Sequence, residues 1–239
     1  MLVSSKLYCL FVLLLLALIT AVCVKLRKLT LPASLAALVI GLLVFLAAQE
    51  KGILMLLIFF ALSVLATSHK KVIKARVIAK RIHPQTRNVQ QVFANGGVAA
   101  LISILTLFDP PHAALYKIMI AASLASALAD TLSSELGMVY GRRFYNILSF
   151  KREQNGLDGV VSLEGTVIGF VGACIIALIY AGIGIQMVFV TIAGVMGNLL
   201  DSILGACLER KHRIGNNVVN FINTLFAALV ASIFYWLYY

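Results

Sequence analysis

Long apolar stretches, separated by short polar connections, run along the whole chain. Eight can be marked, at residues 7–24, 31–48, 52–67, 91–108, 113–136, 159–181, 183–208 and 218–239. A helix rises about 1.5 Å per residue, so most of these stretches approach the roughly 30 Å of a bilayer core. The third stretch is the shortest, so the pattern predicts six to eight transmembrane helices, with eight favoured. We therefore expect an all-α polytopic membrane bundle.

Composition supports this class. The 239 residues are 62% hydrophobic and only 12% charged, which excludes an ordinary soluble domain. The first stretch resembles a cleaved signal peptide, but its apolar run is long and a second hydrophobic hairpin follows at once, which favours a retained span. The four cysteines, Cys9, Cys23, Cys174 and Cys207, all fall in predicted spans and are interpreted as small packing residues.

The net charge of +11 is unevenly distributed. Basic residues follow the first, third, fifth and seventh spans, whereas the other connections carry almost none. The basic residues are Lys25, Arg27 and Lys28; Lys70, Lys71, Lys74, Arg76, Lys80, Arg81 and Arg87; Arg142, Arg143, Lys151 and Arg152; and Arg210, Lys211 and Arg213. The positive-inside rule then predicts both termini outside the cytoplasm and the 68–90 and 140–158 loops inside it. Topology and attraction to anionic lipid explain this charge without nucleic acid.

Five patches of polar residues interrupt the apolar sequence. Each polar group costs several kcal/mol at the bilayer centre unless it is paired or hydrated, so we expect these groups to be functional. The patches are Arg87-Asn88, Gln90-Gln91 and Asn95-Gly96-Gly97; Asp130-Thr131, Ser133-Ser134-Glu135 and Gly137; Asp158-Gly159, Ser162 and Glu164-Gly165-Thr166; Asn198, Asp201-Ser202 and Gly205; and Asn216-Asn217, Asn220 and Asn223.

Depth along the helices brings these patches to one level. Asp130 and Asp201 lie near the ends of their spans, about 25 Å along, while Asn95 and Glu164 lie about 6 to 8 Å into spans entered from the basic side. This predicts a pocket open to the cytoplasm, unlike the midplane sites of carriers. Residues 1–86 would form N-terminal membrane hairpins with a basic loop, and residues 87–239 a catalytic core with all the polar motifs.

Helical spacing adds two expectations. Asn198, Asp201, Ser202 and Gly205 form one stripe, as do Asn216, Asn220 and Asn223, so each set must face protein or water. Gly165, Gly169 and Gly172 form a small-residue face for close helix packing. Two pairs of motifs follow the same order, which indicates a parallel internal repeat. In one, Asn95-Gly96-Gly97 leads to Asp130-Thr131, and in the other, Glu164-Gly165-Thr166 leads to Asp201-Ser202.

Several carboxylates at one depth must protonate, pair with a base or share a cation. Asp130, Glu135, Asp158, Glu164 and Asp201 are too many for pairing within spans that contain almost no basic residues. Their oxygen-rich neighbours favour Mg²⁺, with Mn²⁺ as a substitute, over zinc. The alternative is a buried network of carboxamides and protonated acids.

Magnesium, basic loops and an interfacial pocket together indicate a phosphate-bearing substrate. Cations at Arg87, Arg142, Arg143, Lys151 and Arg152 can reach phosphate oxygens. The Asn95-Gly96-Gly97 segment could present backbone N–H groups to an anion at a helix start. The sequence contains no nucleotide-binding P-loop and no serine-hydrolase elbow, so a nucleotide would be held by metal, amides and loop cations.

The joint order of the five patches, from Arg87 to the C-terminus, resembles the transmembrane protein 19 family, which includes the phytyl-phosphate kinase of the vitamin E pathway. The resemblance implies a multi-span kinase that transfers a phosphoryl group from a nucleoside triphosphate, with CTP as the expected donor, to an isoprenoid monophosphate. Val160 and Glu164 depart from the family pattern, and residues 140–157 lack its proline-rich character. These departures leave the acceptor lipid open.

On this interpretation Asp130, Glu135, Asp158 and Asp201 are catalytic, and Asp130, Asp201 and Glu135 hold the metal. The substrate- and nucleotide-binding set is Arg87, Asn88, Gln91, Asn95, Gly96, Gly97, Thr131, Ser134, Arg142, Arg143, Lys151, Ser162, Glu164, Gly165, Thr166, Asn198, Ser202, Gly205, Asn217 and Asn220. The alternatives are a lipid cytidylyltransferase, a polyprenyl-phosphate carrier or flippase, and a purely structural membrane protein.

Overall fold

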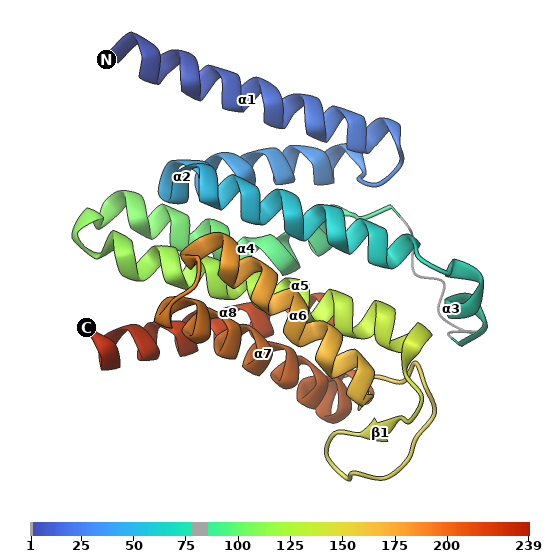
Figure 1. Cartoon of the computed structure of the whole chain (residues 1–239). Helices are drawn as coiled ribbons and strands as arrows, with labels where there is room; N and C mark the ends of the chain where they lie inside the picture. Colours follow the sequence, from blue (N-terminus) through green and yellow to red (C-terminus); the bar gives the residue numbers. More distant parts are fainter. Residues whose placement is uncertain (1, 78–85) are drawn as a thin grey trace.

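The computed structural model describes residues 2–77 and 86–239, which form a bundle of helices (Figure 1). The helices are α1 (Leu2–Lys25), α2 (Leu31–Ser68), α3 (Lys71–Val77), α4 (Val89–Phe108), α5 (Ala113–Tyr140), α6 (Leu163–Ala181), α7 (Ile185–Leu204) and α8 (Asn216–Tyr238). In this described part, all of them except the short α3 are long and apolar enough to cross a membrane, which makes seven. The predicted all-α polytopic bundle is confirmed.

Helix α2 combines the second and third predicted spans. Its 38 residues would extend roughly 57 Å if the helix were straight. However, the Lys28 amino group, just before α2, donates to the hydroxyl of Ser68 at its far end (3.1 Å). The chain reverses at Gln49, where φ is 53°, so the two halves run back alongside each other (Figure 1). Each half therefore corresponds to one predicted span.

Helix α5 is the centre of the bundle and contacts α2, α4, α6, α7 and α8. Every side chain from Ile120 to Ala129 is buried, and most are alanine or serine, which let neighbouring helices approach closely. The glycine face of α6 packs here, since a Cβ on Gly165 or Gly169 would come within about 3 Å of the backbone oxygens of Ser133 or Ala129. The predicted packing role of these glycines is confirmed.

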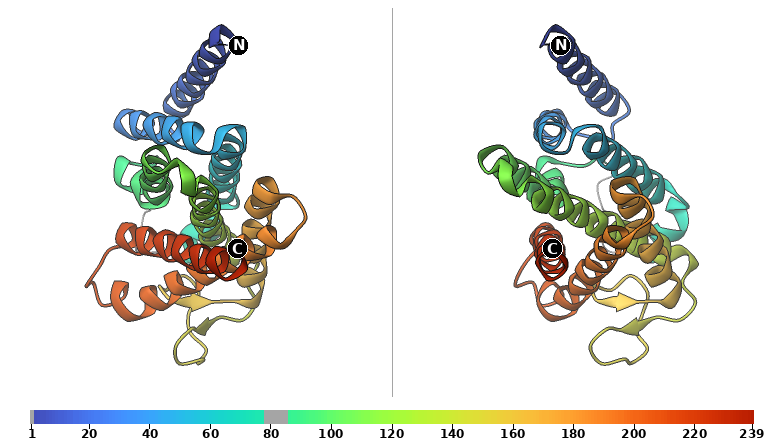
Figure 2. Two further views of the ribbon diagram at one scale, coloured as in Figure 1. Left: turned by 90° about the vertical axis from the view of Figure 1, so that its left-hand side faces the viewer. Right: turned by 60° about the vertical axis from the view of Figure 1, so that its left-hand side comes forward.

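Short elements join the helices at the end of the bundle away from the termini. Strand β1 (Tyr145–Asn146) pairs antiparallel with β2 (Val160–Val161), and the π-helix η2 (Gly205–Glu209) continues α7. At the other end, the 3₁₀ helix η1 (Pro110–His112) precedes α5. Both chain ends lie opposite α3 and the β hairpin, and Figure 2 shows the bundle turned so that the side with the termini comes forward.

Several predicted boundaries shift by a few residues. The sixth span was expected to begin at Gly159, but α6 begins at Leu163, because the Ser162 hydroxyl caps it by accepting the Gly165 N–H (3.1 Å). The seventh ends as an α-helix at Leu204. The basic 68–90 loop contains α3, and its Lys80 and Arg81 lie outside the described residues.

Candidate active site at the loop end of the bundle

A cavity of about 520 Å³ lies at the end of the bundle that carries α3 and the β hairpin. Its walls come from the end of α2, from α3, α4, α5, the 141–162 loop, α6, α7, η2 and the start of α8. All five polar patches therefore converge on one space. The predicted site residues that line it are Arg87, Gln91, Asn95, Asp130, Thr131, Ser134, Glu135, Asp158, Ser162, Gly165, Thr166, Asn198, Asp201, Ser202, Gly205, Asn217 and Asn220.

A pair of carboxyl groups forms the acidic part of the cavity. Asp130 on α5 and Asp201 on α7 lie within hydrogen-bonding reach of each other. Glu135 and Glu209 are close enough to act electrostatically on Asp130, and Asp158 acts on Asp201. Two carboxylates in direct contact cannot both stay charged without a proton or a cation between them. This pair is the most chemically distinctive feature of the cavity.

Amide side chains hold Asp201, one member of this pair, in place. The Asn223 Nδ2 donates to Asp201 Oδ1 at 2.6 Å. With its amide oriented to satisfy its partners, Asn220 Nδ2 donates to the same oxygen at 3.3 Å. The hydroxyls of Ser126 and Ser133 on α5 donate to the Asn223 and Asn198 side chains. The predicted polar stripes of α7 and α8 thus face each other and α5.

Cations form another part of the wall. Lys74 on α3 is buried, and its Nζ donates to the Ala66 and Thr67 carbonyls and pairs with Glu135 at 2.5 Å. Arg87 is tied in place by backbone hydrogen bonds to the segment before α2. Burial lowers the pKa of its guanidinium, and the negative charge of Glu135 opposes this shift.

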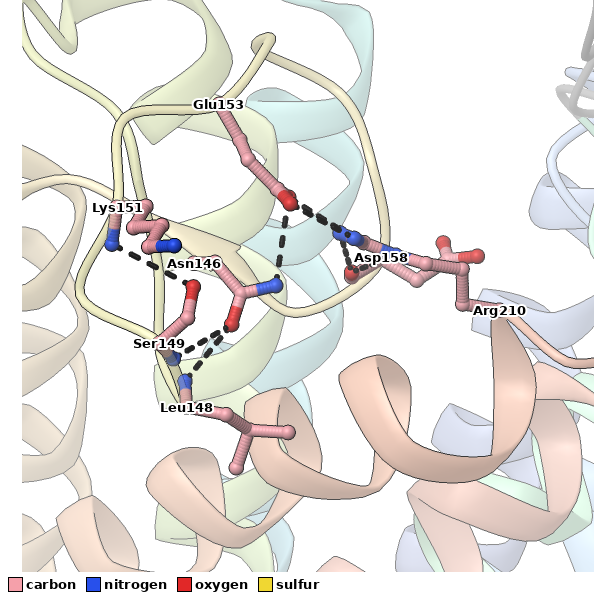
Figure 3. A network of polar contacts seen from close by, with 7 residues as sticks. All are labelled: Asn146, Leu148, Ser149, Lys151, Glu153, Asp158 and Arg210. Carbon is pink, nitrogen blue, oxygen red and sulfur yellow. Dashed lines mark hydrogen bonds and ion pairs between the residues drawn. The ribbon is translucent and has the colours of Figure 1, made fainter.

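The loop that carries Asp158 is fixed by Arg210, which follows η2. The guanidinium donates to the Asp158 carbonyl at 2.6 and 3.1 Å and pairs with Glu153 at 2.9 Å (Figure 3). Asn146 Nδ2 also donates to Glu153 at 3.3 Å. Gly159 has φ +74°, and a Cβ there would collide with Ala206 of η2. Arg210 and Gly159 thus hold Asp158 at the cavity.

Some predicted site residues lie outside the cavity wall. Asn88 caps α4 through a reciprocal bond with Gln91. The helix begins at Val89, so Gly96 and Gly97 lie inside it rather than at a helix start, and they pack against Ile40 and Phe221. Arg142, Arg143 and Lys151 are exposed on the loop, and the Glu164 carboxylate accepts the Arg142 N–H at 3.4 Å. The expected anion site at Asn95-Gly96-Gly97 is therefore wrong, because its N–H groups belong to the helix interior.

The donor set fits a hard cation. Within the described residues no group of three or more His, Cys, Asp or Glu side chains surrounds a single point. Mg²⁺ usually needs only one or two carboxylates, since water and phosphate oxygens complete its shell. Asp130 and Asp201 offer that number, and the buried Asn95 Oδ1, which has no hydrogen-bond partner, offers a further oxygen in the same cavity. Glu135, a predicted ligand, instead has Lys74 as its partner.

Sequence reasoning missed several cavity residues. Lys28, Lys71 and Lys74 were interpreted as topology signals, yet all three line the cavity. Glu209 does so as well. The positions of Lys71, Lys74 and Glu209 depend on how α3 and η2 fold against the bundle, and neither spacing nor hydropathy indicates that fold. A lysine-rich loop was the only available indication.

Comparison with known proteins places this arrangement in a family. The model of an integral membrane protein family, DUF92, matches residues 14–228. This match covers most of the chain and every described residue that lines the cavity. The chain belongs to the DUF92 integral membrane protein family. No solved structure gives a significant match to this DUF92 protein.

Curated relatives of this DUF92 protein come from distant organisms. An uncharacterized membrane protein of Methanocaldococcus jannaschii is 35% identical over 77% of this chain and 76% of its own. One of Synechocystis sp. is 31% identical over 81% of this chain and 77% of its own. Protein VTE6, chloroplastic, of Arabidopsis thaliana is 30% identical over 82% of this chain and 62% of its own. The similarity therefore spans most of the membrane bundle.

Proposed function

We propose that this protein is a prenyl-phosphate kinase that phosphorylates an isoprenoid monophosphate, such as phytyl phosphate, to the diphosphate. The donor would be a nucleoside triphosphate, with CTP expected first, and Mg²⁺ would be required. The reaction would occur at the cytoplasmic face. The contact between Asp130 and Asp201 in a polar cavity at one end of a membrane bundle is the observation that carries the proposal.

The family resemblance supports the reaction class. The five ordered motifs resemble the family that includes phytyl-phosphate kinase, and the similarity to VTE6 extends over most of the chain. The cavity volume of about 520 Å³ is within the range for small-molecule sites. Its position at the end of the bundle suits a substrate with a phosphate in water and a chain in lipid.

The reaction would be a direct phosphoryl transfer. An oxygen of the acceptor phosphate forms a bond to the γ-phosphorus, the bond from that phosphorus to the β–γ bridging oxygen breaks, and the nucleoside diphosphate leaves. The acceptor is already an anion at neutral pH, so positioning and charge neutralisation suffice without a strong general base. A bound Mg²⁺ would neutralise part of the negative charge of the phosphates.

The side chains would position the reactants. Asp130 and Asp201 would bind the cation, and Asn198, Asn217 and Asn220 would orient phosphate oxygens from the same wall. Asn95 Oδ1 is free to accept a hydrogen bond from a ligand donor. Arg210 would keep Asp158 and its loop closed over the cavity.

A lipid cytidylyltransferase would use the same nucleotide and cation but attack the α-phosphorus, and product analysis separates the two reactions. Purified protein in detergent is incubated with prenyl monophosphates and each nucleoside triphosphate labelled at the α- or γ-phosphate. We expect γ-label in a prenyl diphosphate, loss of activity on chelation and recovery with Mg²⁺ or Mn²⁺. Transfer of α-label, activity that survives thorough chelation, or restoration by zinc alone would contradict the proposal.

A further inference from the structure

Three cations on the N-terminal part of the chain share a wall of the cavity. Lys28 lies between α1 and α2, Lys74 lies on α3, and Arg87 precedes α4; we call these three residues the basic wall. The paired carboxyls, by contrast, lie on α5 and α7. The cavity therefore has cations and paired carboxylates on different helices, which suggests two different binding tasks.

The basic wall is only partly neutralised. Glu135 pairs with Lys74, and the Lys28 Nζ donates to the Ser68 hydroxyl. The guanidinium carbon of Arg87 lies 6.0 Å from the centre of the Phe60 ring. In the described part of the chain no carboxylate forms an ion pair with Arg87. Cations withdrawn from water are stabilised by an anion with matching hydrogen-bond acceptors. A phosphate group supplies both the charge and the acceptors.

We infer that the basic wall binds the phosphate of the acceptor lipid, an assignment that rests on the proposed kinase function. A nucleoside triphosphate arrives with its divalent cation, so the Asp130–Asp201 pair suits it. A lipid monophosphate carries no such cation and must be neutralised by side chains. Arg87 can bind two of its oxygens through its planar fork, and lysine ammonium groups add point charges.

Apolar residues beside the basic wall suit the lipid chain. Val64 lies one helical turn before Ser68 on α2, and Met138 lies one turn after Glu135 on α5. Both line the cavity. The phosphate would thus rest on the basic wall while the first carbons of the isoprenoid contact Val64 and Met138. This geometry distinguishes a prenyl monophosphate from a water-soluble phosphate.

The test measures binding without catalysis. Farnesyl monophosphate is titrated into purified protein in detergent with EDTA and no nucleotide, and farnesol serves as the phosphate-free comparison. We expect Arg87→Gln and Lys28→Gln each to weaken monophosphate binding about tenfold while leaving farnesol binding unchanged. Asp201→Asn should bind the monophosphate as the wild type does. The matched control is Lys211→Gln, an exposed lysine outside the cavity wall, which should change nothing.

Lys74 needs a paired design, because its removal alone leaves Glu135 without its cation. The double variant Lys74→Gln/Glu135→Gln removes both charges and should also weaken monophosphate binding. Binding of CTP with Mg²⁺ is measured in parallel on every variant. Loss of nucleotide binding with normal lipid binding in the Arg87 and Lys28 variants would assign the wall to the nucleotide and overturn the inference.

The assay also separates this inference from the proposed function. Phosphate-dependent lipid binding that requires Arg87, without diphosphate formation from any nucleotide, would refute the kinase and retain the subsite. Diphosphate formation with wild-type lipid affinity in the basic-wall variants would refute the subsite and retain the kinase. Equal binding of farnesol and its monophosphate by the wild type would also refute the subsite.

Discussion

At the residue scale, the carboxylate of Asp201 is oriented by two amides on one neighbouring helix. Asn223 and Asn220 donate to the same oxygen, Oδ1, and Ser126 donates to the side-chain oxygen of Asn223. This chain of bonds fixes which way the Asn223 amide points, and so how Asp201 faces Asp130. Such supporting contacts keep ligand side chains in a productive geometry.

We predict that Asp130→Asn and Asp201→Asn each reduce turnover by about a hundredfold or more, or about 2.7 kcal/mol of transition-state stabilisation. Each change removes a charge from the pair, while an amide at residue 201 can still accept the Asn223 hydrogen bond. The fold should therefore persist. Turnover is measured on monodisperse variants with a prenyl monophosphate and CTP.

Lys70→Gln is the control for these variants and should be nearly silent. Lys70 lies outside the cavity wall, with its amino group 4.8 Å from the centre of the Tyr140 ring. Near-normal turnover of both aspartate variants would remove Asp130 and Asp201 from the active site.

Sequence reasoning reached the acidic and amide residues of the site but, among the cations that line the cavity, only Arg87. The spacing of Asn216, Asn220 and Asn223 predicts one helix face, and that face does meet Asp201. Helical periodicity is a local property, so such stripes can be recognised from sequence. Lys74 reaches Glu135 only because α3 folds under the end of α2, and a tertiary contact of this kind leaves no local pattern.

At the element scale, the 141–162 loop and the π-helix η2 act as one unit. Arg210 bonds the Asp158 carbonyl and pairs with Glu153 (Figure 3). Gly159 lies against Ala206 of η2. π-helical turns are often found at functional sites. Hydropathy placed residues 159–162 in the sixth span and residues 205–208 in the seventh, because it cannot detect a capping serine or an i+5 hydrogen-bond pattern.

The Arg210–Glu153 pair makes docking of this loop dependent on pH. The hydrogen bond from Arg210 lowers the pKa of Glu153 below its ordinary value of 4.5, so the pair stabilises the docked loop above that pH. This contribution is lost as the pH falls through the lowered pKa. We predict that Arg210→Gln increases hydrogen exchange in the loop several-fold at pH 7. The wild-type loop should lose protection as the pH falls below 4.5, and the variant should show no such loss.

Hydrogen exchange of the loop peptides, corrected for intrinsic rates, measures both effects. Lys211→Gln is the adjacent control and should retain the wild-type profile. Equal loop protection in Arg210→Gln and wild type would show that Gly159 and the β1–β2 pairing hold the loop without Arg210.

At the scale of the whole molecule, the reversal of α2 determines whether the chain crosses the membrane an odd or an even number of times. Counted as two crossings, α2 brings the number of described spans to eight, which agrees with both termini lying at one end (Figure 1). The four basic connections meet at the other end, where Arg87 bonds to the segment after α1 and Arg210 holds the loop after α5. Residues from both predicted segments, 1–86 and 87–239, line the cavity.

The positive-inside rule therefore predicts that the cavity end faces the cytoplasm and that both termini face away from it. In a background without Cys9, Cys23, Cys174 and Cys207, a single cysteine replaces Arg76 on α3 or His112 on η1, both of which are exposed. A membrane-impermeant thiol reagent added outside intact cells should label the His112 variant and spare the Arg76 variant until the membrane is opened. Labelling of the Arg76 variant from outside would show that the protein has the opposite orientation, in which cytoplasmic nucleotide could not reach the cavity.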